Sequence, residues 1–152
     1  MASGVYPEAL HGAREMDIIT IALGTNDADR FFAANGKWTE ADDAQFVASC
    51  EKLVKSFYDR NNNLKFFIFN AFTCFRQDSD YVAGIPDVRE AQQAAYDSLV
   101  AKGYNMLGFL DAGKLTEDMK KYFSDGLHPN DPGHKLLAER IAEYLQGELL
   151  DK

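Results

Sequence analysis

The stretch Asp17-Ile18-Ile19-Thr20-Ile21-Ala22-Leu23-Gly24 decides the fold class of this 152-residue chain. It is a short, β-branched apolar run that ends at a glycine, and such a run is typical of a buried strand. Residues 64–69 (Leu-Lys-Phe-Phe-Ile-Phe) and 106–110 (Met-Leu-Gly-Phe-Leu) are runs of the same kind, bounded by turn or polar residues. The sequence therefore predicts three buried strands.

Amphipathic helices are predicted between and after these strands. Residues 39–61 carry apolar side chains at helical spacing, with Thr39 as N-cap and Asp42 three residues later. Residues 86–102 repeat the pattern and end at Gly103, which suits a left-handed C-cap, and a last helix begins near Asp131-Pro132. Strands that alternate with helices indicate a parallel sheet with right-handed crossovers, so we expect one α/β domain over residues 1–152.

The composition excludes several classes of partner. The chain has 24 Asp and Glu against 16 Lys and Arg, and its formal net charge is −8. It would repel phosphate backbones and anionic lipid surfaces, so we expect neither a nucleic-acid nor a membrane partner. A domain of this size can bury a sizeable core without disulfide bonds or a structural metal. Cys50 and Cys74 are therefore expected to be packing residues.

The sequence contains no predicted membrane span or export signal. No apolar run approaches the roughly 20 residues that cross a bilayer, and residues 1–8 have neither a basic nor an apolar signal region. We therefore expect a soluble protein, and the sequence leaves open whether it is cytoplasmic or secreted.

Two polar turns follow predicted elements of the sheet. Gly24-Thr25-Asn26-Asp27 comes directly after the first strand, where a neutral amide can donate hydrogen bonds, although such residues also simply cap helices. Asp125 lies three residues before His128, across a glycine and ahead of a proline. Its carboxylate can accept the Nδ1 proton of the imidazole and leave Nε2 free as a base, whereas the plainer alternative is a loop histidine beside a helix-capping aspartate.

The remaining histidines carry no predicted chemistry. His128, His134 and Asp125 or Asp131 are suitable ligand types for a metal, but they lack a compact spacing such as His-Glu-x-x-His, so we expect no metal. His134 is expected to pack in the first turn of the last helix. His11 has no acidic partner at a telling distance and is assigned no role.

The pairing of Gly24-Thr-Asn-Asp27 with Asp125-Gly-Leu-His128-Pro129, followed by Gly133-His134, resembles the third and fifth conserved blocks of the SGNH, or GDSL-type, hydrolases. The resemblance covers residues 17–149. It implies a three-layer α/β/α sandwich of the flavodoxin-like kind and an esterase activity without metal or other cofactor. It also implies that Asn26 donates to the oxyanion, that His128 is the general base and that Asp125 orients His128.

The sequence departs from that family at the nucleophile. The family's first block is a Gly-Asp-Ser segment after an N-terminal strand, and this sequence contains no Gly-Asp-Ser. Ser79 follows Asp78 but lies in the loop after the second strand, where a nucleophile is not expected. Gly4 is the residue that could correspond to the oxyanion glycine of the second block. We therefore expect a domain that lacks the family's first strand and nucleophile block.

Two functions remain as hypotheses from the sequence. The first is hydrolysis of a small acyl ester, such as an acetylated sugar, by the C-terminal part of a serine esterase. It rests in part on aromatic residues expected near the mouth of the site: Phe31, Phe32, Trp38, Phe72, Phe75 and Tyr81. The second is a non-catalytic module that binds a sugar or ester, or a subunit that needs a complementing chain. Under either hypothesis an incomplete sheet would be covered by a second copy or by a complementing N-terminal segment.

Overall fold

The computed structural model describes residues 16–28, 36–76 and 80–150, and within them the three predicted strands form one parallel sheet. β1 (Ile18–Ala22), β2 (Lys65–Phe69) and β3 (Met106–Leu110) lie in the order β1-β2-β3. Ile18 is in register with Lys65, and the pairing of β2 with β3 shifts between Phe66 and Phe67. The predicted parallel α/β fold is confirmed.

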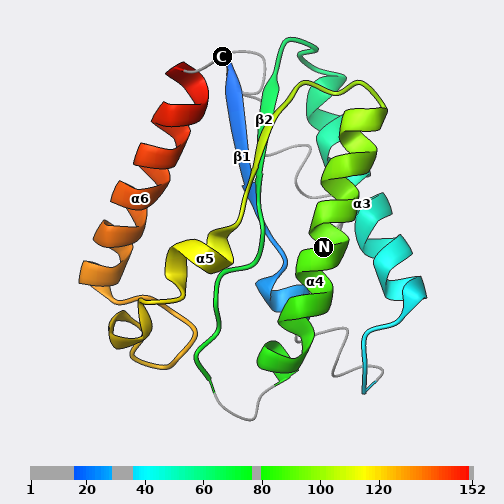
Figure 1. Ribbon diagram of the computed structural model, residues 1–152. Coiled ribbons are helices and arrows are strands. Elements are labelled where there is room, and N and C mark those ends of the chain that lie inside the picture. The colour runs from blue at the N-terminus through cyan, green and yellow to red at the C-terminus, as the bar shows by residue number, and fades with distance from the viewer. Residues whose placement is uncertain (1–15, 29–35, 77–79, 151–152) are drawn as a thin grey trace.

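Helices cover both faces of the sheet (Figure 1). α3 (Glu40–Tyr58) and α4 (Asp80–Ala101) lie on one face, and α5 (Ala112–Thr116) and α6 (Asp131–Leu150) lie on the other. A short 3₁₀ turn, η2 (Lys120–Tyr122), joins α5 to the loop before α6. The arrangement is a three-layer α/β/α sandwich in which the carboxyl ends of all three strands point the same way.

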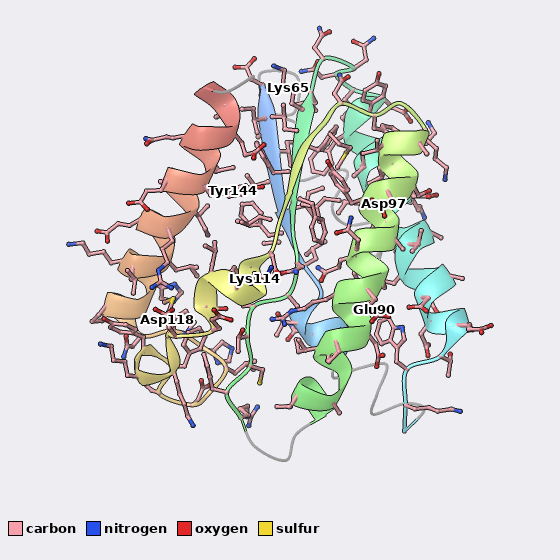
Figure 2. All side chains as sticks on the ribbon, viewed as in Figure 1. Lys65, Glu90, Asp97, Lys114, Asp118 and Tyr144 are labelled. Carbon is pink, nitrogen blue, oxygen red and sulfur yellow. The ribbon has the colours of Figure 1, made fainter. Side chains whose placement is uncertain are left out.

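Alternation along the strands produces the two halves of the core. Ile21, Phe66 and Ile68 face α3 and α4 and pack with Val54 and Leu99. Strand side chains on the opposite face point toward α5 and α6: Phe67, Phe69 and Leu110 are buried there and pack with Ala112 of α5. Tyr144 of α6 points toward the sheet (Figure 2), where its hydroxyl donates to Phe109 O at 3.2 Å.

Most helix ends follow the sequence prediction. Thr39 caps α3 in a capping box with Asp42, and Gly103 ends α4 with φ +80°. The predicted start of α4 at Pro86 is wrong, because the helix begins at Asp80 and contains Pro86. The extra turn is held by packing: Ile85 is buried, and Gly84 lies against Ala28 so closely that a Cβ would be 2.5 Å from Ala28 O.

The two cysteines are free, as expected of packing residues. Cys50 lies in the core between α3 and α4, and burial raises the pKa of its thiol to about 12. Among the described residues no helix is both long and apolar enough to cross a membrane.

Candidate active site

Asn26 lies in the turn that follows β1. Gly24 has φ +114°, which a residue with a side chain rarely adopts, and residues 25–28 then form a helical turn in which Ala28 N donates to Gly24 O at 2.9 Å. A Cβ on Gly24 would lie 2.7 Å from Val88 Cγ1 of α4. The glycine therefore allows the chain to pass close to α4 and to present Asn26, which is exposed, at the carboxyl edge of the sheet.

Asp125 and His128 form the predicted hydrogen-bonded pair. His128 Nδ1 and Asp125 Oδ2 are 2.6 Å apart. The other carboxylate oxygen, Oδ1, accepts the backbone N–H groups of Leu127 at 2.9 Å and of His128 at 2.7 Å. The Asp-x-x-His segment thus forms a tight turn, in which one carboxylate accepts hydrogen bonds from both the backbone N–H and the imidazole of His128.

These contacts fix the charge of Asp125 and the tautomer of His128. The backbone N–H of His128, its imidazole and the N–H of Leu127 hold the pKa of the Asp125 carboxyl well below its usual range. An ionised carboxylate only accepts hydrogen bonds, so Nδ1 must carry the shared proton. Nε2 of the neutral ring is then the free base. The side chain of His128 is 75% exposed, so this nitrogen is accessible to a reacting molecule.

The site residues lie at one edge of the sheet. The turn after β1 and the loop before α6 are both at the end where the strands finish (Figure 1), as expected for a parallel sheet. Asp125 and His128 are joined directly, whereas no hydrogen bond among the described residues connects them to Asn26. Gly4, the expected oxyanion glycine, lies outside the described residues.

Comparisons with known proteins identify the family of this chain. A model of the GDSL-like Lipase/Acylhydrolase family matches residues 3–136, which is most of the chain and includes Asn26, Asp125 and His128. The chain belongs to the GDSL-like lipase/acylhydrolase family. Membership of this family supports a general esterase or acylhydrolase function.

Solved structures share the fold of this family member. One crystal structure matches with a TM-score of 0.67 at 20% identity, over 93% of this chain and 70% of that chain. A candidate GDSL-like lipase from Parabacteroides merdae ATCC 43184 matches with a TM-score of 0.59 at 17% identity, over 88% of this chain and 65% of that chain. No curated protein matches significantly.

Gln92, which was not predicted from the sequence, connects the ends of β1 and β2 in this GDSL-like domain. Gln92 is 2% exposed on α4. Its Nε2 donates to Leu23 O after β1 and to Phe69 O at the end of β2, and its Oε1 accepts from Ala71 N at 2.9 Å. An amide within the apolar face of the helix, between Val88 and Ala95, is the signal that could have found it.

Further polar contacts join the segment after β2 to α5 and its N-cap, Asp111. Local sequence patterns did not predict these contacts. Asn70 Nδ2 donates to Asp111 Oδ1 at 3.0 Å, and Asn70 Oδ1 accepts from Gly113 N at 3.1 Å. Thr73 N donates to Thr116 Oγ1 at 2.9 Å. These bonds fix the short helix α5 beneath the carboxyl edge of the sheet, where the domain's site residues lie.

The aromatic residues expected at the mouth of the site are mainly used in packing. Phe72 and Phe75 pack on the core around Met119 and Phe123, and Trp38 packs beside Phe46 and donates its indole N–H to Asp43 Oδ1 at 2.6 Å. Phe31 and Phe32, and the side chain of Tyr81, lie outside the described part of the structure.

Three of the described serines of this GDSL-like chain form hydrogen bonds within or between α3 and α4. Ser49 and Ser56 donate to carbonyls of α3, and Ser98 donates to Glu51 Oε1. Ser124 is exposed in the loop beside Asp125, and Ser3 and Ser79 are outside the description. His134, expected to pack, is exposed on α6 instead, because its position in the first turn faces away from the sheet.

No group of three or more His, Cys, Asp or Glu side chains in the described ranges could hold a metal ion.

Proposed function

We propose that this chain supplies the base and the oxyanion donor for serine-type hydrolysis of small acyl esters, with acetyl as the acyl group and a sugar or similar polar alcohol as the leaving group. The observation that carries the proposal is the Asp125–His128 pair, in which one ionised carboxylate holds the imidazole with Nε2 free. Family membership supports the reaction class.

In the proposed reaction, Nε2 of His128 accepts the proton of a serine hydroxyl while the serine oxygen forms a bond to the acyl carbon. The carbonyl oxygen becomes an anion, and the Asn26 amide donates a hydrogen bond to it. The bond to the alcohol then breaks, and the proton on Nε2 passes to the departing oxygen. Water repeats the sequence on the acyl-serine. One oxyanion donor is typically worth about 3–4 kcal/mol of barrier.

The serine is proposed to come from a segment that pairs with β1 along the edge that no other strand of the described residues covers. β1 is the first strand of the sheet order, and Lys65 N donates to Asp17 O at 3.0 Å. Because backbone groups alternate in a parallel ladder, Asp17, Ile19 and Ile21 face β2, whereas Ile18, Thr20 and Ala22 direct their N–H and C=O groups outward. Thr20 and Ala22 are exposed. A strand added here would end beside Asn26.

The proposed preference for a small acyl group is supported by the packing of the nearby aromatic rings. Phe72 and Phe75, next to the loop that carries His128, are partly buried against Met119 and Phe123. Rings that are engaged in packing leave little free apolar surface for a long acyl chain.

Hydrolysis of p-nitrophenyl acetate tests the proposal. The chain alone should release p-nitrophenolate slowly, because Nε2 of His128 can act on this activated ester, and the rate should survive replacement of each serine singly. His128→Ala should remove most of this rate. His134→Ala is the matched control, since His134 is also exposed, and should lower the rate much less. Equal rates in the two histidine variants would overturn the proposal and favour the ester-binding module.

A further inference from the structure

The loop that carries His128 is too exposed to be held by its own burial. The side chains of His128 and Asp125 are 75% and 52% exposed. The loop is closed at its base, where Phe123 and Pro129 form an isolated antiparallel bridge and Asn130 N donates to Tyr122 O at 2.7 Å. These contacts shape the loop, but they do not by themselves fix the imidazole relative to the ends of the strands.

Residues 71–76, which we call the strap, make contacts that hold the His128 loop relative to the ends of the strands. Phe75 N donates to Gly126 O at 2.7 Å, and the ring of Phe75 meets that of Phe123 edge to face at 5.0 Å. Gly126 has φ +77°, and a Cβ there would lie 2.8 Å from Arg76 N. The strap therefore touches the loop at its base and at Gly126, two residues before His128.

The strap is itself anchored at alternate residues. Ala71 N donates to Gln92 Oε1, and Ala71 O accepts from Arg89 Nε, both at 2.9 Å. Thr73 N donates to Thr116 Oγ1 at 2.9 Å, and Thr73 Oγ1 donates to Gly113 O at 2.9 Å. One end of the strap is thus bound to α4, its middle to α5, and its last residues to the His128 loop.

Gln92 extends these contacts to the other half of the site. The amide that accepts from Ala71 also donates to Leu23 O, one residue before Gly24 and the turn of Asn26. Gln92 therefore connects the first residue of the strap to the residue before Gly24, while the last residues of the strap contact the His128 loop.

We propose that the strap is the positioning element of the site, and that Phe75 and Gly126 are positioning residues that hold the Asp125–His128 pair at the carboxyl edge of the sheet. The catalytic meaning of this inference rests on the proposed function, but the placement of the pair does not. Its test therefore measures the pair directly in the whole chain and needs no turnover.

The first measurement is amide hydrogen exchange, with the Phe67 amide of β2 as the internal reference for global stability. In Phe75→Leu, the His128 amide, which donates to Asp125 Oδ1 at 2.7 Å, should exchange at least about tenfold faster relative to Phe67. Phe75→Tyr keeps the ring and should restore slow exchange. The His128 Nδ1–H proton signal should broaden in Phe75→Leu and return in Phe75→Tyr.

A second variant changes the contact between the strap and the His128 loop on the side of the loop. Gly126→Ala combines strain at a positive φ with a collision against Arg76, whereas Gly103→Ala has the same strain at φ +80° and nothing within 4 Å of the added Cβ. Only Gly126→Ala should speed exchange of the His128 amide relative to Phe67. Exchange at His128 that simply follows Phe67 in Phe75→Leu and in Gly126→Ala would overturn the inference. Ester hydrolysis that does not depend on His128 would instead overturn the proposed function and leave this result intact.

Discussion

At the scale of single residues, the geometry of Asp125 determines which nitrogen of His128 is the base. In Asp125→Asn, the backbone N–H groups of Leu127 and His128 still require an acceptor, so the amide oxygen should take the place of Oδ1. The amide NH₂ then faces Nδ1, which must accept, and the proton moves to Nε2. We expect nitrogen NMR of His128 to change from the Nδ1–H to the Nε2–H tautomer. Asp118→Asn, which removes another exposed carboxylate, should leave His128 unchanged.

The same contacts give a pH dependence with a definite sign. The folded-state pKa of Asp125 is depressed, so the pair's contribution is fully present above the unfolded pKa of about 3.9 and is lost as pH falls through the folded value. Both side chains are more than half exposed, and solvent screening keeps the effect on global stability small. The carboxyl carbon signal of Asp125 should therefore stay that of a carboxylate at pH 4. A half-titrated signal there would contradict this prediction.

At the scale of elements, Gln92 joins α4 to the ends of β1 and β2. Gln92→Met keeps the volume but leaves Leu23 O and Ala71 N, among the groups it binds, without this partner. We expect a loss on the order of 2 kcal/mol or more in the free energy of unfolding, measured by urea denaturation. The control Gln93→Met changes the neighbouring exposed residue, whose amide donates to Asp97 on the same helix, and the free energy of unfolding should change by no more than about 0.5 kcal/mol. Equal losses in the two variants would contradict the assigned role of Gln92.

The elements also explain what the sequence could and could not predict. The strands and the Asp125–His128 pair were predictable because apolar runs and an Asp-x-x-His turn are local patterns. The start of α4 was not, because packing of Gly84 on Ala28 extends the helix ahead of Pro86. α5 is too short for a periodic signal, and the bonds of Gln92 join residues up to 69 positions apart.

At the scale of the whole molecule, the outward groups of β1 are expected to bring a second chain to the sheet. We expect light scattering to find a dimer when no complementing segment is present. Thr20→Pro removes an outward N–H while leaving the groups that face β2, so it should give a monomer, and Thr20→Val should remain dimeric. A monomeric parent chain with an intact sheet would count against this expectation.

We infer that this GDSL-like domain supplies the base and the oxyanion donor, and that the attacking serine comes from another segment. Labelling with a fluorophosphonate probe, read by intact mass, tests it most directly. We expect the chain alone to stay unmodified, with none of its six serines labelled: Ser3, Ser49, Ser56, Ser79, Ser98 and Ser124. Stoichiometric labelling of one of these serines, lost in His128→Ala, would overturn this inference and place the nucleophile within this sequence.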